Sequence, residues 1–121
     1  MAVTKTVLGA ILVDTVYVDT DVVGTVVYAT TSSSTLYQID IDNSLNTAVS
    51  YLKIYDAADA TAGTTSPNYI LKAPGSGRIS YSIPEGQPLP TALGYCCTNA
   101  PGVAGSTGPT NDVTVRFLFD D

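Results

Sequence analysis

Hydrophobic and polar residues alternate over much of this chain, with the two-residue period of a strand that buries one face. Over residues 112–120 the alternation predicts one apolar face of four side chains: Val113, Val115, Phe117 and Phe119. Over residues 35–42 it predicts another apolar face: Tyr37, Ile39 and Ile41. We therefore predict a half-buried strand in each of these segments.

Residues 48–56 alternate in the same way, and here the pattern predicts that Leu52 and Ile54 are buried. Three larger or polar side chains then lie on the opposite face: Tyr51, Lys53 and Tyr55. Further strands are predicted over residues 22–30, 69–73, 78–83 and 92–98, with one or two more within 5–19.

Proline and glycine divide the second half of the chain. Residues 74–77 read Pro-Gly-Ser-Gly, and we expect them to join the strands 69–73 and 78–83 in a hairpin. Residues 84–90 contain three prolines. Because proline lacks a backbone donor, we expect the chain to turn a corner here and not to extend the ladder of hydrogen bonds.

About eight short strands with regularly spaced turns are typical of a sandwich or barrel of antiparallel sheets. We predict an all-β fold, a jelly-roll-like antiparallel β-sandwich that forms a single domain over residues 1–121. No internal repeat or linker divides the chain. The N-terminal segment 1–20 is expected to form a strand or an arm that contacts neighbouring subunits.

The net charge of −6 excludes some partners, because no cluster of Lys or Arg is present to neutralise a run of phosphates. We expect no nucleic acid and no membrane as partner, since no stretch approaches the roughly 20 apolar residues that cross a bilayer. The N-terminus also lacks the continuous apolar region of a signal peptide. We therefore expect the chain to be made in a reducing cytoplasm and not to be exported through a signal peptide.

The two cysteines, Cys96 and Cys97, are adjacent, and neighbouring side chains of a strand point to opposite faces. A disulfide between them would need a strained ring. We therefore expect two buried thiols.

Histidine is absent, which removes the usual general base and the commonest metal ligand. Nothing basic lies near Cys96 or Cys97 in the sequence to lower a thiol pKa for nucleophilic attack. We expect no enzymatic activity and no cofactor.

Two carboxylate pairs could face one cation: Asp19 with Asp21, and Asp40 with Asp42. Residues two apart in a strand share a face, and paired carboxylates suit Ca²⁺. The alternative, that these residues are solubilising side chains, is favoured because the chain has no EF-hand pattern and no Gly-rich Asp repeat.

Candidate contact residues come from the tyrosines and from two stretches, 57–68 and 99–111, that are predicted as surface loops. Amphipathic aromatic side chains are enriched at protein contacts. The candidates are Tyr51, Tyr55, Tyr69, Pro101 and Val103. The alternative is that the tyrosines fill the core or a sheet face.

Several short segments resemble a recurrent family of small phage virion proteins with the pattern YLKLYD, GTDTP and LPAG, a late GL.Y..T strand and a C-terminal NDVTV strand. The matching segments here are SYLKIYDA at 50–57, GTTSP at 63–67, GSG at 75–77, ALGYCCT at 92–98 and NDVTV at 111–115. The resemblance spans roughly residues 48–121. It implies a phage structural protein of β-sandwich type and carries over no catalytic residue. The adjacent cysteines and the proline-rich 84–90 segment depart from the pattern.

We expect a capsid decoration or cement protein, which binds the assembled shell and stabilises it through many identical contacts. Its expected partners are the major capsid protein and copies of itself. We expect a homo-oligomer, and analogy with shell-binding proteins suggests a trimer. Its expected location is the capsid surface of the virion. The alternatives are a tail, adaptor or fibre component, or a carbohydrate- or Ca²⁺-binding module.

Overall fold

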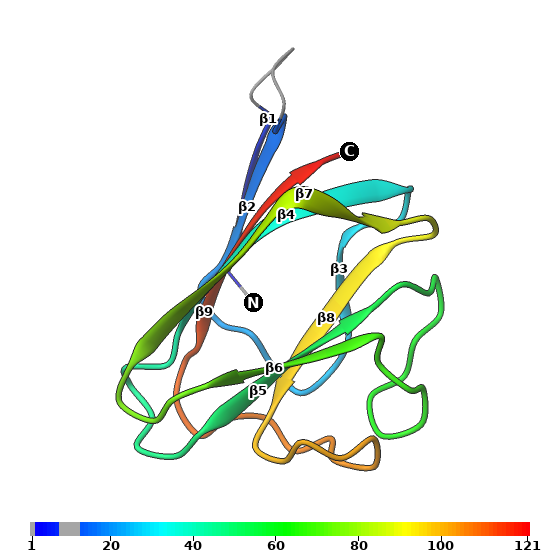
Figure 1. Ribbon diagram of the computed structural model, residues 1–121. Coiled ribbons are helices and arrows are strands. Elements are labelled where there is room, and N and C mark those ends of the chain that lie inside the picture. The colour runs from blue at the N-terminus through cyan, green and yellow to red at the C-terminus, as the bar shows by residue number, and fades with distance from the viewer. Residues whose placement is uncertain (1, 8–12) are drawn as a thin grey trace.

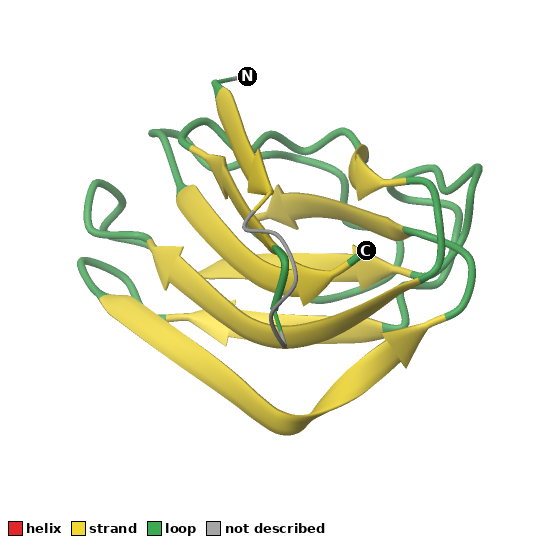
Figure 2. Ribbon diagram, turned by 90° about the horizontal axis from the view of Figure 1, so that it is seen from above, coloured by secondary structure: helices red, strands yellow, loops and turns green. Residues whose placement is uncertain are grey.

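The computed structural model describes residues 2–7 and 13–121, and this part of the chain folds into strands with no helix (Figures 1 and 2). No segment in these two ranges is a helix that could cross a membrane. The strands are β1 (Val3–Val7), β2 (Thr15–Asp19), β3 (Val27–Thr30), β4 (Ser34–Asp42), β5 (Ser50–Tyr55), β6 (Tyr69–Ala73), β7 (Arg78–Leu89), β8 (Leu93–Thr98) and β9 (Thr114–Asp120).

The strands form two antiparallel sheets that pack face to face, so the predicted all-β sandwich is confirmed (Figure 1). The larger sheet has the order β1-β2-β9-β4-β7, and the smaller sheet has the order β3-β8-β5-β6. From β2 to β9 the pairing is nested: β2 pairs with β9, β3 with β8, β4 with β7 and β5 with β6.

The core lies between the sheets and takes alternate residues from each. Strand β9 contributes Val115, Phe117 and Phe119, and β5 contributes Leu52 and Ile54, all fully buried. The predicted buried faces of these two strands are therefore confirmed. Each such side chain stabilises the fold by roughly 1.5–3 kcal/mol relative to exposure.

The buried face of β4 differs from the prediction, because Leu36 and not Tyr37 joins Ile39 and Ile41 in the core. Leu36 pairs with Phe119 of β9 and Gln38 pairs with the adjacent Leu118, so Tyr37 has no partner in β9. A β-bulge of this kind shifts the alternation by one residue.

Strand β7 bends in the proline-rich segment, but it continues to Leu89, so the prediction that the ladder of hydrogen bonds ends here is wrong. Four residues of β7, 83–86, lie opposite the single Tyr37 of β4, and pairing resumes at Gln87. The long edge strand at the bottom of Figure 2 shows the bend that results. Since β7 is an edge strand, the missing donors of its prolines do not interrupt pairing with a second neighbour.

The turn 74–77 does not make the predicted hairpin, because β6 belongs to the smaller sheet and β7 to the larger one. Hydrogen bonds to residues 43–46, which follow β4, hold the turn in place. Asn43 Nδ2 donates to Pro74 O at 3.0 Å, and the Ser76 N–H donates to Asn46 O at 2.6 Å. A Cβ on Gly75 would lie 2.1 Å from Thr47 O, so the turn is pressed against this backbone. These contacts direct the chain across the sandwich.

The N-terminal segment forms two strands, and the antiparallel pair of β1 and β2 rises beyond the body of the sandwich in Figure 1. All five residues of β1 are exposed, whereas β2 alternates between buried and half-buried positions. Strand β1 is the outer edge of the larger sheet. The apolar residues Leu8, Ile11 and Leu12 lie outside the described residues.

Candidate interaction surface

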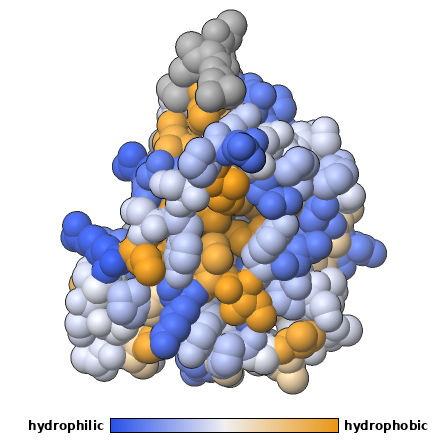
Figure 3. All heavy atoms as spheres, viewed as in Figure 1, coloured by the Kyte–Doolittle hydropathy of each residue, from blue (hydrophilic) through white to orange (hydrophobic). Residues whose placement is uncertain are grey.

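A groove opens along one edge of the sandwich, between the edge strands β6 and β7. It has a volume of about 310 Å³ and is lined mainly by apolar side chains. Its floor belongs to the core and consists of Leu36, Ile39 and Ile54. Figure 3 faces this edge and shows the apolar side chains between polar borders. We call this feature the edge groove.

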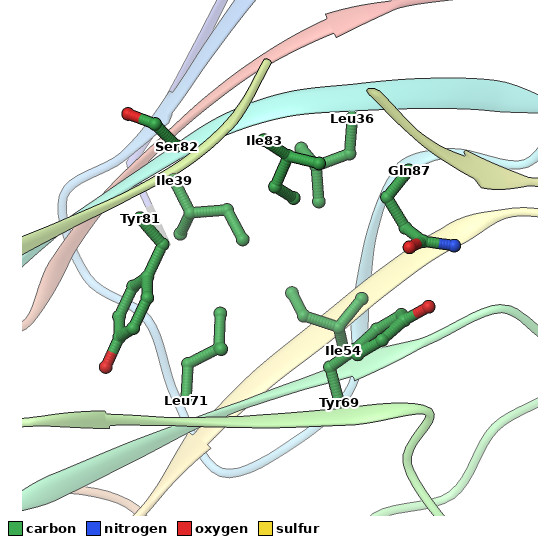
Figure 4. Close-up of a pocket in the computed structure, with 9 residues that line it drawn as sticks. All are labelled: Leu36, Ile39, Ile54, Tyr69, Leu71, Tyr81, Ser82, Ile83 and Gln87. Carbon is green, nitrogen blue, oxygen red and sulfur yellow. The ribbon is translucent and has the colours of Figure 1, made fainter. Parts of the chain in front are cut away.

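The walls of the edge groove come from both sheets (Figure 4). Leu71 of β6 points up toward Ile39 and Ile83, and Tyr69 and Gln87 lie at the opposite end from Tyr81. The Tyr81 hydroxyl donates to Lys72 O at 2.6 Å and so ties the edges of the two sheets together at one end.

The bulge in β7 explains why the groove stays open. Strand β7 pairs with β4 through Ser82 and again from Gln87, so Ile83 lies in the stretch without partners. Gly86 has a φ of +79°, a backbone conformation that glycine adopts without steric cost. The bend therefore carries the wall away from β6 beyond Tyr81.

No charged side chain of the described residues lines the edge groove. Strands β6 and β7 carry two basic residues, Lys72 and Arg78, and one acidic residue, Glu85. Lys72 is exposed to solvent. The Arg78 guanidinium forms an ion pair with the Asp42 carboxylate at 3.1 Å.

Of the predicted contact residues, Tyr69 lies at the groove, with 39 % of its surface exposed. Pro101 and Val103 are exposed, but they lie on the loop 99–111 and not at the groove. Tyr51 is half-buried on β5. The structure therefore does not bring these residues together into one surface.

Tyr55 is fully buried, which removes it as a contact residue. Its hydroxyl lies 3.7 Å from Cys96 Sγ, and burial is the main cause that raises the pKa of Tyr55. The sequence pattern placed Tyr55 correctly on the face of β5 opposite Leu52 and Ile54. That face is not open to solvent at this position.

Lys53, on the same face of β5, is also fully buried, and the cause is the loop 99–111. Its ammonium group donates to Gly102 O at 2.6 Å and to Gly105 O at 2.9 Å. The Asn99 N–H also donates to Thr107 O, which closes the loop on itself. This loop lies along the sheet and does not extend as an arm toward neighbours.

The pair Asp19 and Asp21 does not form a surface cation site. Asp19 is fully buried and accepts a hydrogen bond of 2.6 Å from the Tyr95 hydroxyl. The backbone N–H of Asp21 donates to the other carboxylate oxygen at 2.9 Å. Asp19 is therefore part of an internal polar network.

Asp40 and Asp42 share the outer face of β4, as predicted, but arginines lie beside them. Asp42 is paired in register with Arg78 of β7, and Asp40 with Arg116 of β9. Hydrogen bonds from Ser44, with a smaller effect from Arg78, lower the pKa of Asp42. The described residues contain no group of three His, Cys, Asp or Glu side chains that could hold a metal ion. This setting favours surface charge pairing over cation binding.

Both cysteines are free and fully buried, as predicted. Cys97 belongs to the core between the sheets, and Cys96 lies beside Tyr55 on the other face of β8. Burial raises the pKa of both thiols, that of Cys97 to about 12. A thiol that stays protonated is a poor nucleophile.

The sequence pattern did not identify the edge groove as a site. The alternation of Ile79, Tyr81 and Ile83 did indicate an apolar face in this strand, and Leu71 was visible in the preceding one. What the pattern could not indicate is that β6 and β7 belong to different sheets and that neither has a second partner strand among the described residues.

Comparison of the chain with known protein families, with curated proteins and with solved structures found no match. We therefore infer its function from the strand order, the exposed N-terminal strand and the edge groove.

Proposed function

We propose that this chain is a structural protein of a phage virion, which binds the assembled capsid as a decoration protein and stabilises it. The observation that carries the proposal is the nested pairing of β2 to β9. This order supports a jelly roll, an arrangement that occurs in viral capsid domains and also in lectins and cupins.

A second source of support is the resemblance of residues 48–121 to small phage virion proteins. Its segments correspond to definite elements of the fold: SYLKIYDA covers β5, ALGYCCT covers β8, and NDVTV leads into β9. The pattern is therefore one of strands and turns. Such a pattern fits a protein whose role is to present a rigid surface.

The exposed strand β1 supports a role in assembly. Among the described residues it is an edge strand with β2 as its neighbour, so its outer backbone groups are available to pair with another chain. Val7, with 68 % of its surface exposed, adds apolar area at the end of the strand. Contacts of this kind are weak singly, and their repetition over a symmetric shell stabilises the whole.

In this proposal the partners are the major capsid protein and further copies of the chain, as a homo-oligomer on the capsid surface. A trimer is suggested by analogy with shell symmetry alone.

The test is quantitative mass spectrometry of purified virions of the source phage, with the copy number of this chain scaled to that of the major capsid protein. A copy number comparable to that of the capsid protein is expected. A few to a few dozen copies would move the chain to the tail, and complete absence would overturn the virion role.

A further inference from the structure

We infer that β1 is a strap that opens as a unit from the edge of the larger sheet, and that the Lys5 side chain fastens it. The inference concerns the isolated chain and does not rest on the proposed function. Three features carry it: the small contact between β1 and the sandwich, the surroundings of the Lys5 ammonium group, and the side of β2 to which β1 is bonded.

Strand β1 buries little apolar surface. All five of its residues are exposed, and Val3 and Val7 keep 37 % and 68 % of their surface open to solvent. Among the described residues, β2 is its one partner strand. Local opening begins where few apolar side chains are buried and the backbone hydrogen bonds are exposed. We therefore expect β1 to open at a lower free energy than the strands of the core.

The Lys5 side chain crosses from the larger sheet to the smaller one. Its ammonium group donates to Ala29 O of β3 at 3.2 Å and lies 5.8 Å from the centre of the Phe119 ring. Ala29 is buried and lies at the bulge of β3, where the register with β8 skips one residue. A buried backbone carbonyl needs a donor. Lys5 supplies one at a position that β8 does not match.

Asp121 faces the same ammonium group from a second side. Its Oδ2 lies 3.5 Å from Lys5 Nζ, and its Oδ1 accepts the Thr30 hydroxyl at 3.0 Å. The Asp121 N–H donates to the Asp14 carboxylate at 3.0 Å. Two other segments therefore position Asp121 independently of Lys5. An exposed ion pair loses part of its energy to the ordering of both side chains, and this loss is smaller when one partner is already held.

The hydrogen bonds between β1 and β2 give the opening a recognisable signature. Ala2 O accepts the Thr20 N–H, and bonded pairs of an antiparallel ladder recur every second residue. The bonded pairs are therefore Ala2 with Thr20, Thr4 with Val18, and Thr6 with Val16. Tyr17, between the last two β2 residues, turns its backbone groups to the other neighbour, β9. Opening of β1 thus frees the N–H groups of Val16 and Val18 and leaves that of Tyr17 bonded.

The experiment measures the hydrogen exchange of single backbone amides by NMR in the full-length wild-type chain. We call the amides of Thr4, Thr6, Val16 and Val18 the strap amides. They should share one level of protection, at least about ten-fold lower than that of the Tyr17 amide, because opening of β1 requires far less free energy than unfolding of the sandwich.

Lys5→Met removes the ammonium group and keeps the length of the side chain. Protection of the strap amides should fall by about three- to ten-fold, as expected for the loss of one hydrogen bond, while that of Tyr17 changes by less than about two-fold. Asp121→Asn keeps an oxygen for the Thr30 hydroxyl and should lower the same protection by about two- to five-fold. Lys72→Met is the matched control, since it removes the same charge from an exposed lysine of β6.

Equal protection of the strap amides and of Tyr17 in the wild type would overturn the inference, since β1 would then open only with the whole molecule. A fall in Lys5→Met no larger than that in Lys72→Met would overturn the role of Lys5 as the fastening. Neither result depends on the copy number in virions, so failure of this inference is distinguishable from failure of the proposed function.

Discussion

At the scale of single residues, a chain of three buried polar groups connects the two sheets. Tyr17 of β2 and Tyr95 of β8 join their hydroxyls at 2.8 Å, and Tyr95 donates to Asp19 of β2 at 2.6 Å. Their rings meet edge to face at 5.8 Å between centroids. Burial, followed by the bond to Asp19, raises the pKa of Tyr95 far above its ordinary value. The carboxylate thus has a protonated donor at every ordinary pH.

Tyr95→Phe should remove the hydroxyl donor and leave Oδ2 of the buried Asp19 carboxylate without its hydrogen bond. We expect a loss of about 1.5–3 kcal/mol in the free energy of unfolding, measured by urea denaturation, because the bond involves a charged group. Tyr17→Phe is the control, since it keeps the bond between Tyr95 and Asp19, and its loss should be smaller, about 0.5–1.5 kcal/mol. Equal losses in the two variants would mean that the hydrogen bond to Asp19 contributes no more to the free energy of unfolding than the bond between the two tyrosines.

Lys53 allows a second test at this scale, because its ammonium group joins β5 to the loop 99–111. Lys53→Met keeps most of the side-chain volume and leaves the carbonyls of Gly102 and Gly105 without a donor. We expect faster proteolysis within this loop and a loss of about 1–3 kcal/mol in stability. Lys72→Met changes the same charge at an exposed position and should leave both measurements near wild type. Matching effects of the two variants would rule out the buried contact as the cause.

At the scale of elements, the bend of β7 depends on Gly86. Its φ of +79° is unfavourable for other residues, and an added Cβ would approach Thr35 Cγ2 to 2.5 Å and Tyr37 Cε1 to 2.9 Å. The bend thus presses the strand against the bulge of β4. It also determines how far the edge groove opens.

Gly86→Ala should therefore destabilise the protein by about 1–3 kcal/mol, visible as a lower midpoint of thermal unfolding. Gly102→Ala is the matched control, because no atom lies within 4 Å of a Cβ at that position. A melting midpoint for Gly86→Ala equal to that of Gly102→Ala would show that β7 accommodates the side chain by relaxing.

At the scale of the whole molecule, buried acids with raised pKa values make stability depend on alkaline pH. Burial raises the pKa of Cys97 from 9.0 to about 12, and those of Cys96, Tyr17 and Tyr55 are also raised. Below the pKa values of the unfolded chain, both states hold these protons. Above them, the unfolded chain loses protons that the folded chain keeps, so stability falls as pH rises.

We therefore expect the free energy of unfolding, measured with urea under reducing conditions, to fall between pH 8 and pH 10. The contribution of Cys97 alone is about 1–2 kcal/mol at pH 10. Cys97→Ala should show a shallower decline over the same range, whatever its stability at pH 8. A decline as steep as that of wild type would assign the effect to other groups.

The edge groove is also a property of the whole molecule, because it exists only where two sheets meet at their open edges. The residues that line it lie between positions 36 and 87 and belong to β4, β5, β6 and β7. No local segment contains it.

The sequence by itself determined the fold class and several buried faces. The two-residue period is a local property, so the core positions of β9 and the inward face of β5 followed directly from it. The opposite orientations of Cys96 and Cys97 followed for the same reason. None of these conclusions needed to know which strand lies beside which.

Only the tertiary structure decided where the local period breaks and what covers each face. The bulge at Tyr37 and the continuation of β7 past Pro84 depend on pairing between distant strands. Lys53 and Tyr55 lie on the face that the pattern indicated, yet both are buried there, Lys53 by a loop that begins more than 40 residues later. A period reports the direction of a side chain along its own strand, whereas burial depends on what the rest of the chain places against it.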